Sequence, residues 1–136
     1  MIACDTNVLV RFLVSDDPEQ TRLAFELFSR ATADERVFIG TVVLVETWWV
    51  TTRAYGISVE QVSGVFERLC HASTVTVEAR SAVMRALEAA RSGADFADAL
   101  IAITASRAGS THTVTFDRRA VKGAGMTLLD DRFLNR

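Results

Sequence analysis

The sequence predicts an α/β protein with a central, mostly parallel sheet of four to five short strands flanked by helices. Short β-branched and apolar runs alternate along the chain with segments whose apolar residues recur every three to four positions, as in helices. The chain has 136 residues, of which 49% are hydrophobic, so it can build one core. We therefore expect a single domain over residues 1–136.

Strand and helix signals alternate through the first part of the chain. The strands expected there are 2–4, 36–40 and 73–77, and the helices are 6–14, 18–33, 41–52 and 58–69. Asp17 and Pro18 suit a helix start, because Asp caps free N–H groups and proline fits the first turn. Ser58 also suits a start, although Glu60 stands one position short of a capping box. The β-branched residues after Thr41 leave the start of that helix open.

The same alternation continues to the end of the chain. The strands expected there are 113–116 and 126–129, and the helices are 78–91, 95–105 and a short one from 117. Gly93 and Gly109 each follow an apolar helical pattern and end it. Strands that alternate with helices indicate a parallel sheet covered by helices.

Composition excludes several classes of protein. The net charge of −2 argues against a protein that binds nucleic acid through bulk positive charge. Cys4 and Cys70 lack CxxC spacing and are expected as buried thiols in a reducing compartment. No signal peptide or membrane-length apolar run is present, so we expect a cytoplasmic protein without a membrane segment.

Two of the expected strands lead directly into an acid. Asp5 follows strand 2–4, which we expect to be buried, and Asp117 follows strand 113–116. Ligands of open α/β sheets bind beyond the carboxyl ends of the strands, so both acids stand at the expected binding edge. Asp is also a preferred helix cap, which leaves a purely structural role open for each.

Two further acids interrupt apolar helical segments. Glu46 and Asp98 both have apolar neighbours on each side, and a buried carboxylate is costly unless it is paired or bound to a metal. Glu46 has the alternative of pairing with an arginine across the core. Asp95 lies one helical turn before Asp98, where a capping role is expected.

Convergence of these acids would require a cation to offset their repulsion. Carboxylate oxygens without a neighbouring His or Cys ligand pattern suit Mg²⁺ or Mn²⁺ rather than zinc. Neither His71 nor His112 lies in a pattern typical of a ligand or general base, and no P-loop, GxSxG or GxGxxG motif is present.

Four segments in chain order carry a specific resemblance. The opening Ile2-Ala3-Cys4-Asp5-Thr6-Asn7-Val8-Leu9 resembles that of PIN-domain ribonucleases. Segments 41–46, 95–102 and 113–117 are similar to the second, third and fourth acidic segments of that family. The most distinctive piece is Asp98-Ala99-Leu100-Ile101, and the chain length resembles that of the single-domain VapC toxins of bacterial toxin–antitoxin pairs.

The resemblance implies a single PIN-like domain with metal-dependent endoribonuclease activity. It carries over four catalytic carboxylates, Asp5, Glu46, Asp98 and Asp117. Asp5 and Asp98 would bind the principal Mg²⁺, with Mn²⁺ as the alternative. Many family members have Asn where Asp117 stands and Asp three residues later, where this chain has Ala120.

The resemblance also implies partners, namely an RNA substrate and a cognate VapB-type antitoxin. Five large aromatic residues exceed what a small domain needs in its core, and some are expected at a homodimer or antitoxin interface. They are Phe25, Phe28, Trp48, Trp49 and Phe66. Burial of all five in the core is the alternative.

Three other functions remain open from the residues. A nuclease-inactive PIN-fold module that binds a protein partner would keep the fold without the chemistry. A haloacid-dehalogenase-type phosphatase needs an Asp two residues after Asp5, where this chain has Asn7. A phospho-receiver needs a lysine after a late strand, and the chain has only Lys122.

Overall fold

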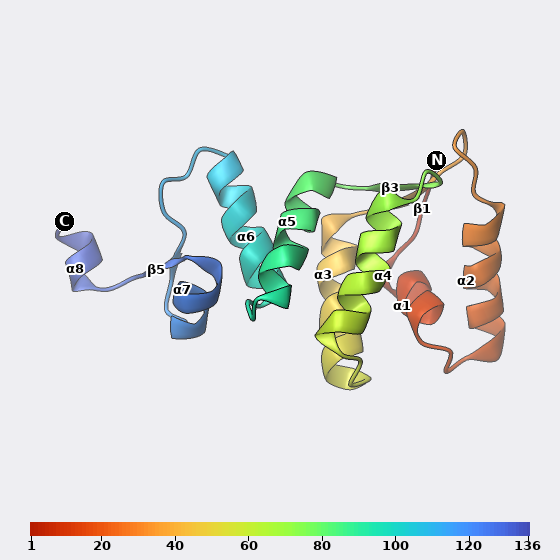
Figure 1. The fold of residues 1–136 in the computed structure, drawn as a ribbon, viewed down its shortest axis with the longest axis horizontal. Coiled ribbons are helices and arrows are strands. Elements are labelled where there is room, and N and C mark those ends of the chain that lie inside the picture. Colours follow the sequence, from red (N-terminus) through yellow and green to blue (C-terminus); the bar gives the residue numbers. More distant parts are fainter. The chain divides into compact units, whose positions relative to one another are not determined.

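The computed structural model describes residues 1–136, which form two compact units, Met1–Arg80 and Ser81–Arg136. Eight α-helices and five short strands confirm the predicted α/β class (Figure 1). The strands divide between a sheet of three in the first unit and a sheet of two in the second, instead of forming one sheet. The single domain expected over residues 1–136 stays a prediction.

The sheet of the first unit is parallel, as predicted, with the order β1-β2-β3. Its strands are β1 (Ile2–Ala3), β2 (Val37–Ile39) and β3 (Val75–Val77). Val37 and Ile39 of the middle strand are buried. The expectation of a buried first strand is wrong for Ile2, which is 48% exposed, because β1 lies at the edge of this sheet. Burial begins only at Cys4.

Helices cover this sheet and build the core of the first unit. They are α1 (Thr6–Leu13), α2 (Pro18–Arg30), α3 (Thr41–Trp49), a π-helical turn η1 (Val50–Ala54) and α4 (Val59–His71). Helix α1 packs against α2 and α3, and α4 packs against β3 and η1. Leu9, Leu44 and Phe66 are fully buried in this unit.

Side-chain caps begin two of these helices. The Oδ1 atom of Asp17 accepts a hydrogen bond from the backbone N–H of Gln20 at 3.0 Å, as its position predicts. Ser58 forms a complete capping box, so the expectation of an incomplete one is wrong. The partner is Gln61, three residues on, whose side-chain oxygen accepts from the Ser58 N–H at 3.3 Å, and Glu60 is not needed.

Helix α3 takes its cap from a distant residue. Its N-cap position is Gly40, which has no side chain to offer. Instead, Oε1 of Glu78 accepts hydrogen bonds from the N–H and the Oγ1 of Thr41, both at 2.8 Å. These bonds lower the pKa of Glu78, the backbone N–H having the larger effect. Glu78 was predicted to begin the next helix. Helix α5 begins instead at Arg80, so Glu78 lies before it and is free to cap α3.

The second unit combines a helical hairpin with a two-stranded parallel sheet. Its elements are α5 (Arg80–Arg91), α6 (Phe96–Arg107), β4 (Val114–Thr115), α7 (Arg118–Ala124), β5 (Thr127–Leu128) and α8 (Asp131–Leu134). Helix α7 packs against α6, β4 and β5, and it ends at Gly125, whose φ of 68° favours glycine. The short helix α8 was not predicted.

Both cysteines are buried and free, as predicted. Burial raises the pKa of the Cys4 thiol to about 11, with a further contribution from the charge of Asp5. Both thiols are therefore held in the unreactive protonated form at neutral pH.

None of the helices has the length and apolar character needed to cross a membrane.

We expect Glu78→Ala to lower the free energy of unfolding by about 1 kcal/mol, the usual effect of losing a helix cap. Because the pKa of Glu78 is lowered in the folded state, its contribution is present above the ordinary value of 4.5 and is lost as the pH falls below it. Urea unfolding of the wild type and Glu78→Ala at pH 7 and pH 3 measures the difference in the free energy of unfolding at each pH.

Glu88→Ala, which removes an exposed acid from the same part of the chain, is the control and should change stability little at either pH. An equal loss at pH 7 and pH 3 for Glu78→Ala would contradict the capping role.

Candidate active site

Asp5 caps helix α1 and keeps one oxygen free. The residue before it, Cys4, is still hydrogen-bonded to the neighbouring strand β2, because its N–H donates to the Phe38 carbonyl at 3.1 Å. The Oδ1 atom of Asp5 accepts from the Val8 N–H at 3.1 Å. The structural role considered for Asp5 is therefore real. Its Oδ2 makes no hydrogen bond and its side chain is exposed, so the capping geometry leaves an oxygen available to a ligand.

Glu46 lies on the outward face of α3, so the expectation that it is buried is wrong. The buried face consists of Leu44, Thr47 and Trp48. Glu46 instead shares its face with Val42 and Trp49, which are 69% and 57% exposed. Glu46 makes no hydrogen bond or ion pair, so the alternative of a core arginine partner is also wrong. Its carboxylate is free in solvent.

Two aspartates of the second unit, Asp95 and Asp117, act on a third, Asp98. Asp95 caps α6, since its Oδ1 accepts from the Asp98 N–H at 3.0 Å, as predicted for this residue. Asp98 stands in the first turn of the same helix, and its carboxylate makes no hydrogen bond or ion pair. Because α6 packs against α7, the Asp117 carboxylate at the start of α7 also acts on Asp98.

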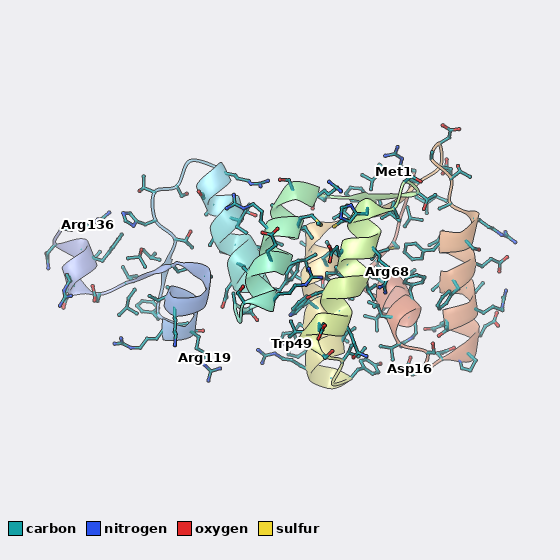
Figure 2. The ribbon with its side chains drawn as sticks, viewed as in Figure 1. Met1, Asp16, Trp49, Arg68, Arg119 and Arg136 are labelled. Atoms are coloured by element: carbon teal, nitrogen blue, oxygen red, sulfur yellow. The ribbon has the colours of Figure 1, made fainter.

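Asp117 is held in place at the end of β4. Its N–H donates to Oγ1 of Thr115 at 3.0 Å, and its Oδ1 accepts from the Arg119 N–H at 2.8 Å. Asp117 is thus the N-cap of α7, where Figure 2 shows Arg119 at the start of the helix. As with Asp5, one carboxylate oxygen serves the helix and the other stays free.

The electrostatics single out Asp98. Burial raises the pKa of its carboxyl, and the negative charges of Asp95 and Asp117 raise it further. The ionised form is disfavoured by its surroundings, and no arginine or lysine offsets this. A bound cation would provide the missing compensation.

The donor chemistry fits a hydrated divalent cation. Within neither unit do three or more His, Cys, Asp or Glu side chains come together as a ready-made metal cage. Mg²⁺ does not require such a cage, because it keeps several waters and is usually bound through one or two carboxylates and substrate phosphates. Asp98 and the free oxygen of Asp117 meet that smaller requirement. Asp5 and Glu46 belong to the first unit.

The sequence reasoning missed the role of Glu78. This residue follows β3 directly, as Asp5 follows β1 closely, so the same signal of an acid at a strand end was present. Oε1 of Glu78 accepts hydrogen bonds from the backbone N–H and the side-chain hydroxyl of Thr41 at the start of α3, which makes Glu78 a structural acid. An acid at a strand end therefore does not by itself indicate the active site.

Comparison with known proteins gives one match. A family model described as the PIN domain matches residues 2–125, a range that extends through the first unit and most of the second. The matched range contains all four acids predicted from the sequence. No curated protein and no solved structure matches the chain.

We expect Asp98→Asn, in the absence of metal, to unfold at the same or a higher urea concentration than the wild type at pH 7. The raised pKa means that the ionised carboxylate destabilises the folded state. Since this penalty is present above the folded-state pKa and disappears as the pH falls through it, the difference should close below the ordinary value of 3.8.

Asp95→Asn is the matched variant and should cost about 1 kcal/mol or less, because Asn caps a helix nearly as well as Asp. A clear loss of stability for Asp98→Asn at pH 7 would show that its carboxylate has a stabilising partner, contrary to the structure.

Proposed function

We propose that this chain, which belongs to the PIN-domain family and so has a nuclease-type fold, is a metal-dependent endoribonuclease. The observation that carries the proposal is the unpaired carboxylate of Asp98 beside Asp95 and Asp117. Asp5, Asp95 and Asp117 each use a carboxylate oxygen to cap a helix. Unpaired acids such as Asp34 and Glu88 are exposed to water, whereas Asp98 is half-buried. Asp98 has no structural use for its carboxylate.

The proposal assigns the chemistry to Asp5, Glu46, Asp98 and Asp117. Asp5 and Asp98 are the proposed ligands of Mg²⁺, or of Mn²⁺ in its place. Support comes from different features: Asp5 has a free oxygen, Glu46 is exposed and unpaired, and Asp98 is charged without compensation. Asp117 is already oriented by its bonds to α7 and Thr115.

The chain's own groups have distinct parts in RNA hydrolysis. When bound, a divalent cation supplies an activated water and stabilises charge on the scissile phosphate. Asp98 provides negative charge in the first turn of α6, and the cap of α7 holds Asp117 in a fixed orientation. Arg118 and Arg119 are exposed beside Asp117 and are suited to hold backbone phosphates of the RNA.

We expect Mg²⁺ to raise the melting temperature of the wild type, because a ligand that binds the folded state stabilises it. Asp98→Asn and Asp5→Asn should lose most of this gain. Both should also cleave RNA roughly 10³-fold more slowly, since a catalytic metal supplies several kcal/mol of transition-state stabilisation. Melting curves with Mg²⁺ or EDTA and cleavage of a labelled single-stranded RNA measure these effects.

The exposed acid Asp34, away from any strand end, gives the control Asp34→Asn, which should behave like the wild type. Full activity of Asp98→Asn would exclude it from catalysis. A wild type that binds its partner but cleaves no RNA in Mg²⁺ would favour the nuclease-inactive binding module.

The finer biological proposal is that the chain is the toxin of a toxin–antitoxin pair and acts in the cytoplasm. Its partner would be a small VapB-type antitoxin, and a second copy would complete a homodimer. Of the five aromatic residues, some of which were expected at an interface, Trp48 and Phe66 are buried, Phe28 is half-buried, and Phe25 and Trp49 are 49% and 57% exposed. The exposed pair supports an interface on the first unit.

Phe25 also belongs to an apolar groove on this unit. The ring of Phe12 packs on those of Phe25 and Phe28, with centroids 4.8 Å and 4.5 Å away. The groove has a volume of about 450 Å³, and its only charged lining residue is Arg68. Figure 2 labels Arg68 on α4. Such a groove suits an amphipathic segment that carries apolar anchors and an acid.

We expect Phe25→Ser to weaken binding of the antitoxin encoded beside the gene by about tenfold or more, because truncating an aromatic anchor often costs 2 kcal/mol. RNA cleavage by the free protein should not change. Isothermal titration calorimetry measures the affinity. Phe133→Ser, on the other unit, is the control. Unchanged antitoxin affinity in Phe25→Ser would remove this groove from the interface.

A further inference from the structure

A polar hollow of about 370 Å³ lies within the second unit, at the end of helix α6 opposite to Asp98. It is formed by the last turns of α6, the segment that leads into β4, and parts of α5 and β5. Its polar lining consists of Arg85, Ser106, Arg107, Ser110, Thr111, His112, Thr113 and Thr127. No acidic residue lines it. The hollow therefore combines positive charge with several hydroxyl groups.

The two guanidinium groups are brought together by one contact between helices. Nη2 of Arg107 donates to Oγ of Ser81 at 2.9 Å, which joins the end of α6 to the start of α5. Arg85 is four residues after Ser81 and so lies on the same face of α5. Arg85 makes no hydrogen bond or ion pair with the protein, so all of its donors are available.

One face of α6 connects this hollow with the acidic end of the helix. Asp98, Ala102 and Ser106 are spaced four residues apart, so they lie on a common face. Ala102 and Ser106 also line the hollow. Eight residues of helix span about 12 Å, which corresponds to three to four nucleotides of a stacked strand at about 3.4 Å each.

We propose that the hollow binds a backbone phosphate of the RNA substrate, three to four nucleotides from the phosphate that is cleaved. This inference rests on the proposed endoribonuclease function. Arginine forks and hydroxyl groups are the groups that recognise phosphate, and a hollow without acids has no internal partner for their charge. The net charge of −2 means that RNA affinity must come from local sites of this kind.

The test compares the full-length wild type with Arg85→Gln, Arg107→Gln and the control Arg132→Gln, which removes an exposed charge of the same unit outside the hollow. Fluorescence anisotropy with a labelled twelve-nucleotide single-stranded RNA is measured in EDTA, so binding is observed without cleavage. We expect about tenfold weaker binding for both hollow variants, and a salt slope smaller by about 0.7 for each lost phosphate contact. Arg132→Gln should bind like the wild type.

Arg85→Gln is the decisive variant, because Arg85 is exposed and makes no hydrogen bond or ion pair whose loss could disturb folding. For Arg107, the melting temperature checks whether loss of the Ser81 bond has unfolded the hairpin. Wild-type affinity in Arg85→Gln, or an equal loss in Arg132→Gln, would overturn the proposal. The proposal would also be overturned if Arg85→Gln lost binding of inorganic phosphate but kept its affinity for RNA. The hollow would then be a site for free phosphate.

The same proteins are then assayed for cleavage in Mg²⁺, which separates the two proposals. A wild type that binds RNA through the hollow but does not cleave it would remove the endoribonuclease function and leave the phosphate site. Cleavage by the wild type together with unchanged RNA affinity in Arg85→Gln would support the endoribonuclease function and remove the phosphate site.

Discussion

The free N–H groups at the start of each helix must find acceptors, and much of this structure follows from how the chain supplies them. Asp5 and Asp117 each follow a strand closely and cap the next helix, and Glu78 follows a strand and caps α3. Each of these acids stands at the carboxyl end of a strand of its own sheet, Asp5 and Glu78 in the first unit and Asp117 in the second. The need to cap helices therefore places carboxylates at strand ends, where ligands of open α/β sheets bind.

Capping and chemistry make compatible demands on an aspartate. In Asp5 and Asp117 one oxygen accepts from a helix N–H, which fixes the carboxylate and leaves the second oxygen without a bond. Asp98 is different, since its carboxylate is bound to nothing and has Asp95 and Asp117 as charged neighbours. The electrostatic cost of the site is thus concentrated in one residue, as is common where function and stability conflict.

Local patterns were sufficient to predict the α/β class, most helix positions and the capping roles of Asp17 and Asp95. Glu46 was misplaced because α3 is apolar on both faces, so periodicity does not reveal which side faces solvent. The exposure of β1 depends on its being an edge strand, and the Glu78–Thr41 bond joins residues 37 apart, so neither can be derived from a short window. The hollow was also missed, because Arg85 and Arg107 come together only through the α5–α6 hairpin.

The capping box at Ser58 follows from local sequence, because Gln serves at the third helical position as well as Glu does. Ser58 and Gln61 have the required spacing, whereas Glu60 stands one position short of it. In the candidate site, Asp98 and Asp117 could be placed near each other from the order of strands and helices. Which of their carboxylate oxygens are hydrogen-bonded and which are free could not be predicted, because this depends on hydrogen bonds that form only in the folded chain.

The remote cap of α3 also bears on how the first unit folds. Gly40 has no side chain with which to cap the helix, so the side-chain cap of its first turn exists only when β3 pairs beside β2 and brings Glu78 to Thr41. The cap therefore depends on a contact of high sequence separation, whose loop closure costs entropy. The stability of α3 is thereby coupled to assembly of the sheet, because a partly folded state with an open sheet lacks the Glu78 cap.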